Sequence, residues 1–292
     1  MVVSRILLFL ILFPGIALAQ QSDSVNTVNK KRLGGFIATS TVVYTASLVG
    51  LSELWYSNSP SQPFQFFNDN AEWKQVDKLG HFFSAYHLSS STSQALRWCG
   101  ISPKKSDIIG AISGFAMLVP IEILDGKSQA YGASSGDLIA DAVGAGLYIG
   151  QSLLWKEQRI TPKFSFHTTS YAPINPDLLG DGLPSEILKD YNGQTYWLSV
   201  DMDKFMKFPR WLNLAAGYGA EGMVYAHDQQ NIDAGYTAPY RQFYIALDLD
   251  LTSIKTRSKA VKALIFFANM IKIPAPTLEF STKGVRFHAL YF

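Results

Sequence analysis

Apolar residues gather into four long stretches in the first half of the chain, with short polar segments between them. The stretches run approximately over Gly34–Leu51, Asp77–Trp98, Asp107–Leu124 and Gly136–Trp155. Each is roughly 18 to 22 residues long, the length of a helix that crosses a bilayer. The pattern therefore predicts a four-helix bundle of membrane-like hydropathy over residues 34–155. Ser106 is a suitable N-cap for the third helix, and Pro120 is expected to kink or tighten its last turn.

Glycines four residues apart occur in two of these stretches, at Gly110/Gly114 and Gly146/Gly150. This spacing lets helix backbones approach closely, either inside a bilayer or inside a compact bundle. Basic residues lie at alternate ends of the four stretches, as in a protein that crosses a membrane four times. A cleaved leader would conflict with that topology, because it would leave the first basic cluster, Lys30–Arg32, on the outer side. The sequence leaves this choice open.

The second half of the chain has shorter apolar runs. Residues 156–195 are rich in Pro, Asp, Gly and Ser and are interpreted as a linker made of loops. Residues 196–292 contain several runs that favour strands, together with one amphipathic helix at Lys259–Ile271. The runs are Tyr196–Val200, Leu212–Tyr218, Phe243–Leu251 and Val285–Phe292. We therefore expect an α+β fold, in which the helical bundle is followed by a small antiparallel β-rich C-terminal region.

One of these runs, FYIALDLDL at Phe243–Leu251, alternates with a period of two. Its odd-numbered residues are all apolar, whereas its even-numbered residues include Asp248 and Asp250. Such alternation is typical of a half-buried strand, with the apolar residues on the buried face.

The N-terminus has the features of a secretory signal peptide. Arg5 precedes the apolar run ILLFLILFPGIALA, which ends in small residues and is followed by QQSDS. We expect residues 1–19 to be a signal peptide that is cleaved after Ala19; the alternative is an uncleaved membrane anchor. In either case the chain reaches the bacterial cell envelope, faces the periplasm and associates with the inner or the outer membrane.

Composition supports an envelope protein and excludes some other classes. Of the 292 residues 48% are hydrophobic and only 16% are charged, below the usual quarter. The net charge of +2 provides no broad basic face for a nucleic acid, so we expect none as a partner. The single cysteine, Cys99, excludes an internal disulfide and a multi-cysteine zinc site.

Three clusters of ionisable residues lie near the ends of the predicted helices. They are DKLGH at Asp77–His81, EILDG at Glu122–Gly126 and SSGDLIAD at Ser134–Asp141. If the helices alternate up and down, all three clusters lie at one end of the bundle and form a shared polar mouth. Isolated charges in an apolar bundle are costly, so such groups pair, bind a cation or line a wet cavity. Alternatively, Asp77 and Asp137 are merely helix-start residues favoured by the helix dipole.

The residue types in this mouth indicate two kinds of chemistry. Asp77 and His81 are four apart and share a helix face, so the carboxylate can orient the imidazole for acid/base work or metal binding. Lys78 can pair with either neighbour or bind an anion. The candidate catalytic residues are thus Asp77, Lys78 and His81, and the candidate ligand-binding residues are Glu122, Asp125 and Ser135. The candidate ligands of a divalent cation are His81, Glu122, Asp137 and Asp141.

The segments DKLGHFFSAYHLS, EILDGKS and SSGDLIADAVGAG, in this order, resemble the YfiM-like predicted periplasmic lipoproteins, a domain family of unknown function. They are more distantly similar to the VanZ-like membrane proteins. The resemblance covers about residues 35–155 and implies no established activity. The lipid attachment that the family's description implies has no matching cysteine near Ala19. The positions that the resemblance marks are Asp77, Lys78, His81, Glu122, Asp125, Gly126, Ser135, Asp137, Asp141 and Gly144.

Two functional hypotheses follow. In the first, this is a non-catalytic, membrane-associated envelope protein whose polar mouth locks the helices together or binds a ligand or ion. In the second, it is a metal-assisted or acid/base hydrolase or transferase that acts on a lipid-linked or cell-wall substrate. Both hypotheses predict membrane or envelope components as partners. The oligomeric state is not predicted by the sequence.

Overall fold

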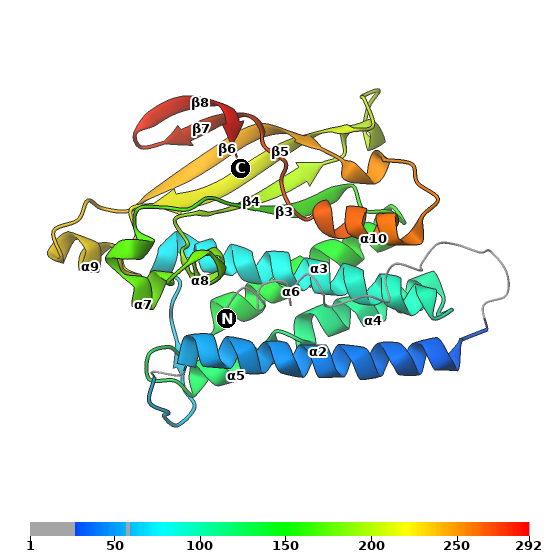
Figure 1. Ribbon diagram of the computed structural model, residues 1–292, viewed down its shortest axis with the longest axis horizontal. Helices are drawn as coiled ribbons and strands as arrows, with labels where there is room; N and C mark the ends of the chain where they lie inside the picture. Colours follow the sequence, from blue (N-terminus) through cyan, green and yellow to red (C-terminus); the bar gives the residue numbers. More distant parts are fainter. Residues whose placement is uncertain (1–26, 57–58, 292) are drawn as a thin grey trace. The chain divides into compact units, whose positions relative to one another are not determined.

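The computed structural model describes residues 27–56 and 59–291 (Figure 1). It confirms an α+β fold, with helices in the N-terminal half and a six-stranded antiparallel sheet in the C-terminal region. The chain forms two compact units. The helical unit comprises Met1–Asp69, Ser84–Glu157 and Thr256–Leu264, and the sheet unit comprises Asn70–Phe83, Gln158–Lys255 and Ile265–Phe292. The predicted signal peptide lies outside the described residues.

The predicted four-helix bundle is not confirmed, because the third apolar stretch forms two helices. The helices of this half are α2 (Lys30–Tyr56), α3 (Val76–Trp98), α4 (Pro103–Ala116), α5 (Val119–Gly126) and α6 (Ser135–Leu154). Pro120 lies at the start of α5, where its missing N–H group costs nothing, and α4 has already ended at Ala116. Ser106 is not an N-cap, because α4 begins at Pro103 with Ser102 in the capping position.

A buried carboxylate joins three helices of the helical unit. Asp107 in α4 accepts hydrogen bonds from Ser93 Oγ and Arg97 Nη2 of α3, both at 2.6 Å, and from Tyr148 Oη of α6 at 2.7 Å. Tyr148 also packs edge-on against Tyr86 of α3, with 5.9 Å between the ring centroids. These contacts fix the packing of α3, α4 and α6.

The two glycine pairs have different surroundings. A Cβ atom at Gly114 would lie 2.6 Å from the carbonyl oxygen of Ala85 and 2.8 Å from the backbone nitrogen of Ser89, both in α3. The other pair, Gly146 and Gly150 in α6, has no atom of the described residues within 4 Å of an added Cβ. Close backbone approach is therefore a property of the α3–α4 contact.

This difference gives a matched pair of variants. Gly114→Ala is expected to lower the free energy of unfolding by about 2 kcal/mol, because backbone atoms of α3 must move to admit the methyl group. Gly146→Ala is expected to be neutral or to raise it by up to about 1 kcal/mol, because alanine favours the helix. Urea denaturation of both variants checks this. Equal effects would contradict the packing described for α3 and α4.

The sheet unit contains six strands in sequential order, each antiparallel to its neighbours. They are β3 (Ile160–Phe166), β4 (Gln194–Val200), β5 (Leu212–Glu221), β6 (Tyr240–Leu249), β7 (Ala275–Ser281) and β8 (Gly284–Tyr291). Two of them were not expected: β3 lies where a loop was predicted, and β7 begins at Ala275, between two prolines. Short helices α7 (Pro176–Leu179), α8 (Leu183–Lys189) and α9 (Asp228–Asp233) occupy the connections, and α10 spans Lys259–Ala268. In the helical unit, β1 (Phe66–Phe67) pairs in parallel with β2 (Ala133–Ser134).

The sheet is strongly curled. Thr195 in β4 and Tyr291 in β8 are four strands apart, which would separate them by about 19 Å in a flat sheet. Their hydroxyl oxygens are nevertheless 3.1 Å apart. Tyr291 also donates a hydrogen bond of 2.7 Å to Tyr244 Oη. These contacts place Thr195, Tyr244 and Tyr291 on one inner, concave face.

The concave face is polar and the opposite, convex face is apolar. In β6 the even-numbered residues Tyr244, Ala246 and Asp248 are buried. The odd-numbered residues Phe243 and Ile245 are 53% and 57% exposed. The prediction that the apolar residues of this strand are buried is therefore wrong. The reason is that the polar residues satisfy one another inside the curl.

The polar residues of the concave face form ion pairs and hydrogen bonds with one another. Lys163 Nζ in β3 lies 2.6 Å from Asp248 Oδ2 in β6, and neither side chain is exposed to solvent. Ser199 Oγ donates to the same carboxylate at 2.6 Å. Lys272 Nζ donates to the carbonyl oxygens of Leu247 and Ile273. Burial lowers the pKa of Lys272 to about 8, although Asp248 acts in the opposite direction.

The lowered pKa of Lys272 predicts a pH-dependent stability. Between about pH 8 and 10.5 the unfolded chain holds the lysine proton and the folded chain has lost it, so this lysine makes unfolding less favourable as the pH rises. In Lys272→Met this contribution is absent. The melting temperature of the wild type relative to Lys272→Met is therefore expected to rise from pH 8 to pH 10. A difference that does not change with pH would contradict the assignment.

Two segments are long and apolar enough to cross a membrane, judged by length and composition. They are α2 and the stretch Pro103–Gly126, which comprises α4 and α5. No residue in the apolar window of α2 is buried, whereas 33% of the window in Pro103–Gly126 is buried. A core helix or a signal sequence meets the same criterion, so membrane association stays a prediction.

Candidate metal centre

The candidate centre begins with the first turns of α3. The three residues before this helix, Trp73, Lys74 and Gln75, have positive φ angles, so the chain turns sharply at the helix start. Lys74 is held there by an ion pair with Asp228. Asp77 then occupies the first turn of α3, where a carboxylate interacts favourably with the positive end of the helix dipole.

The second element of the centre is the first turn of α6. Ser134 caps this helix, because its Oγ accepts a hydrogen bond of 3.1 Å from the backbone N–H of Asp137. The backbone N–H of Ser134 donates to Glu122 Oε2 at 2.7 Å, and its hydroxyl donates to Asp69 at 2.6 Å. The cap therefore fixes the backbone from which the buried Asp137 side chain projects.

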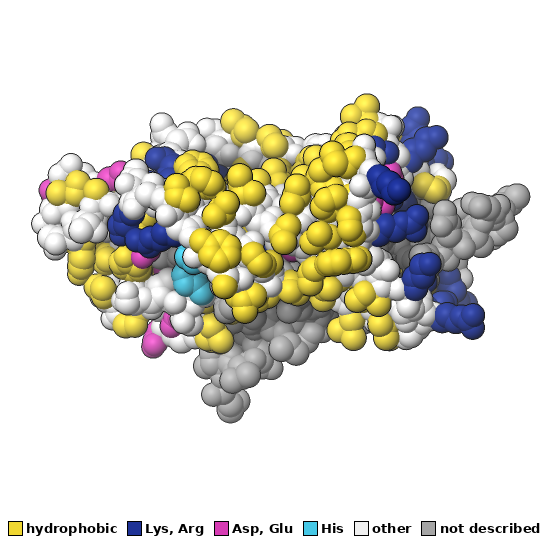
Figure 2. Space-filling view, turned by 90° about the horizontal axis from the view of Figure 1, so that it is seen from above, with side chains coloured by type: hydrophobic (Ala, Val, Ile, Leu, Met, Phe, Trp, Pro, Cys, Tyr) yellow, Lys and Arg dark blue, Asp and Glu magenta, His cyan; other side chains and the backbone are white. Residues whose placement is uncertain are grey.

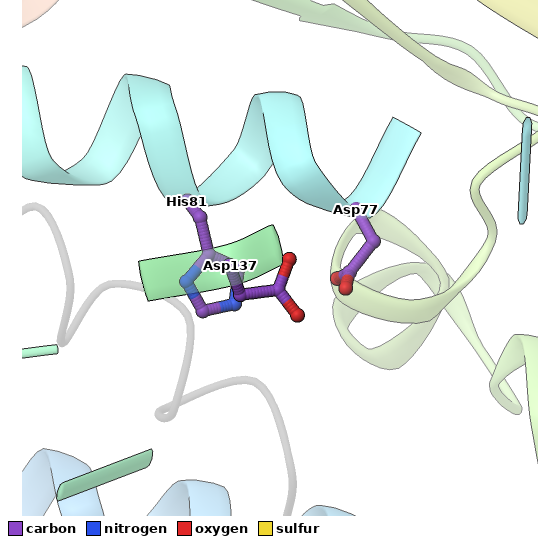
Figure 3. Close-up of side chains that lie close together, drawn as sticks. All are labelled: Asp77, His81 and Asp137. Atoms are coloured by element: carbon purple, nitrogen blue, oxygen red, sulfur yellow. The ribbon is translucent and has the colours of Figure 1, made fainter. Parts of the chain in front are cut away.

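Asp77, His81 and Asp137 lie close together. One possible ligand atom from each residue lies within 4.8 Å of the other two. Figure 3 shows the Asp137 carboxylate beside the His81 ring, with the Asp77 carboxylate on the adjoining turn of α3. The helix dipoles account for the two aspartates, but they do not account for an imidazole beside them.

The Asp77 carboxylate is held by a residue far away in the sequence. Tyr191 Oη donates a hydrogen bond of 2.7 Å to Asp77 Oδ1. Such a bond orients a carboxylate and leaves its other oxygen for a ligand. Tyr196 is also near: burial, together with the negative charge of Asp77, raises the pKa of its phenol. Both tyrosines lie beyond every predicted cluster, and no sequence signal links them to Asp77.

The remaining predicted site residues lie outside this group of three. Glu122 is buried and accepts the hydrogen bond from the Ser134 N–H group, and Asp125 accepts one of 2.7 Å from Tyr56 Oη. Asp141 is fully buried, one helical turn after Asp137. Lys78 is half-buried on the first turn of α3, and Ser135 is exposed at the start of α6. Of the residues that were predicted to share one mouth, the structure thus brings together Asp77, His81 and Asp137.

The chemistry of this group fits a divalent metal ion. Two carboxylates and one imidazole supply oxygen and nitrogen ligands, a set that suits Zn²⁺, Mn²⁺ or Fe²⁺. Two ionised aspartates this close would otherwise repel each other, and a dication would offset their charge.

Taken together, the fold and this group define an α+β protein with a candidate His–carboxylate metal centre at the starts of two helices. Residues 63–151 match the family described as predicted periplasmic lipoprotein (DUF2279). No curated protein and no solved structure matches the chain. The family match supports an exported protein of the cell envelope and carries no assigned activity.

Proposed function

We propose that this chain is a cell-envelope protein that binds a divalent cation through Asp77, His81 and Asp137. The observation that carries the proposal is the approach of three potential ligand atoms to within 4.8 Å of one another. The hydrogen bond from Tyr191 to Asp77 supports it, because metal-binding carboxylates are usually oriented in this way.

Membrane association is part of the same proposal. The helix α2 is 27 residues long, and none of its residues is buried in the chain itself. An apolar helix of this length and exposure is well suited to a bilayer. The finer resemblance to YfiM-like and VanZ-like proteins stays a prediction.

Metal binding can be tested on the full chain after treatment with EDTA. Isothermal titration with ZnCl₂ and MnCl₂ is expected to give one ion bound per chain. At a free metal concentration about 100 times Kd, binding should stabilise the folded state by about 2.7 kcal/mol. The melting temperature should therefore rise by several degrees. His81→Gln and Asp137→Asn are each expected to weaken binding at least about tenfold.

Asp125→Asn is the matched control for these variants. It removes a carboxylate from the same region of the sequence, but one that lies outside the group of three. It is expected to retain wild-type affinity for the metal. The proposal is wrong if the wild type binds no metal, or if His81→Gln and Asp137→Asn bind as tightly as Asp125→Asn.

A second candidate function is metal-assisted hydrolysis or group transfer. The observation that favours it is the number of ligands: the group has three members, and metal sites with three protein ligands keep a position for water or substrate. A metal ion at this place would lower the pKa of such a water. In this function Asp77, His81 and Asp137 would hold the metal ion, which would activate the water, and the substrate is a lipid-linked or cell-wall component.

The open position can be detected without knowing a substrate. With Mn²⁺ bound, the longitudinal relaxation rate of water protons is expected to rise well above that of free Mn²⁺, because a metal-bound water exchanges while the complex tumbles slowly. Fluoride or azide should lower this relaxivity by displacing the water. A bound Mn²⁺ ion that produces no enhancement would exclude an open coordination position and with it this candidate.

A further inference from the structure

The convex face of the sheet unit is a continuous apolar surface over β5 to β8. Backbone pairing places Phe243 opposite Phe280, and Phe280 opposite Val285, so these side chains form a row across three strands. A second row passes through Ala216, Ile245, Leu278 and Phe287, and a third contains Leu214 and Leu247. We call these nine residues the convex patch.

The convex patch is exposed to a degree that is unusual for such side chains. Ile245 is 57% exposed, and Val285 and Phe287 are 65% and 67% exposed. None of its nine positions is charged or polar. The acidic side chains of Asp248 and Glu279 in the same strands are buried on the concave face. This distribution is the reverse of that in a soluble protein, where the polar face meets water.

Basic and aromatic residues flank one end of the convex patch. Lys207 and Arg210 lie in the connection between β4 and β5, and Lys255 follows β6. Because Leu212 pairs with Leu249, both of these segments lie at the same end of the sheet. The exposed side chains of Phe205, Met206 and Trp211 lie in the β4–β5 connection too. We call these six residues the rim.

Figure 2 shows this arrangement in the space-filling view. Hydrophobic side chains spread across the face, and Lys and Arg side chains lie at its right-hand end and, in a second group, toward its left-hand end. Arg210 is 83% exposed, whereas its acidic neighbour Asp203 is only 17% exposed. The solvent-facing charge of the rim is therefore mainly positive.

We propose that the convex patch and its rim bind the surface of a phospholipid bilayer with anionic headgroups. The apolar side chains enter the boundary between headgroups and acyl chains, and Lys207, Arg210 and Lys255 bind lipid phosphates. Trp211 lies at the level where tryptophan is commonly found in membrane proteins. This proposal is independent of the metal centre.

Charge complementarity favours a bilayer over a second copy of the chain. An anionic bilayer presents phosphates directly beside an apolar layer, which matches a basic rim beside an apolar patch. A second copy meeting the same face would bring further lysines and arginines with few exposed acids. Within the six-stranded sheet β3 and β8 are the two edge strands and do not pair with each other, so the sheet is expected to lie on the bilayer without crossing it.

Fluorescence from single positions tests the proposal on the full chain. Cys99 is buried, so an environment-sensitive thiol dye is introduced through Ile245→Cys or Leu278→Cys in the patch, or Gln229→Cys in α9 as the control. Vesicles contain phosphatidylglycerol or only phosphatidylcholine, with or without brominated acyl chains. At both patch positions we expect a blue shift and bromine quenching that depend on phosphatidylglycerol, and at Gln229→Cys neither.

The rim is tested by Lys207→Gln combined with Arg210→Gln. The lipid concentration needed for half-maximal quenching at Ile245→Cys is expected to rise roughly fivefold for each cation removed. Because the dye reports only its own surroundings, membrane binding by α2 does not produce this signal. A blue shift that depends on protein concentration but not on lipid would indicate a second copy and overturn the proposal. Dyes at Ile245 and Leu278 that remain as water-exposed as the control would also overturn it.

Discussion

The ion pair between Lys163 and Asp248 is the constraint on which the sheet unit depends. Both side chains are shut off from solvent, and their charged atoms are 2.6 Å apart although β3 and β6 are separated by two strands. Either charge without the other would cost several kcal/mol in this position. The pair is therefore satisfied only if the sheet curls until β3 reaches β6. In the curled sheet the polar residues Lys163, Ser199, Asp248 and Glu279 are buried, whereas the apolar residues Phe243, Ile245 and Phe287 are exposed.

The curl also explains why large aromatic residues lie on the polar face. Trp197, Tyr244 and Tyr291 fill its interior and offer hydrogen-bonding atoms to the polar residues between them. Gly217, paired with Trp197, leaves room for the indole, because a Cβ there would lie 2.5 Å from the ring. An apolar interior of the same volume would not need Lys163 or Asp248, so these buried charges occupy positions that leucines could fill.

The sequence predicts the helices well where their pattern is long and less well where a proline interrupts it. The helix expected at Asp77–Trp98 begins one residue earlier, and the one expected from Gly136 differs by a residue at each end. The apolar run at 107–124 forms two helices instead of one. Its hydropathy does not show that Pro120 lies at the start of the second helix. β3 was missed although its sequence ITPKFSF alternates, because it lies in a stretch rich in Pro, Asp, Gly and Ser that was interpreted as loops. The candidate centre was predicted in part: the spacing of Asp77 and His81 indicates a shared face, but Tyr191 is fixed only by tertiary packing.

The helix α3 connects the chemistry of the centre with the packing of the helical unit. It is one continuous helix, so its first turns, with Asp77 and His81, are held in line with the later turns that pack through Tyr86 and Ser93. Tyr86 of α3 contacts Tyr148 of α6, and the two helices also approach at Asp77 and Asp137. Tyr86 lies nine residues after Asp77, and Tyr148 lies eleven residues after Asp137. The two helices therefore run in the same direction. Both helix starts therefore point the same way, and their positive dipole ends favour the two carboxylates even before a cation binds. All three residues lie inside the matched range 63–151, whereas every strand of the six-stranded sheet lies outside it. A cation site would thus belong to the part of the chain that matches the family, and the convex patch to the part that does not.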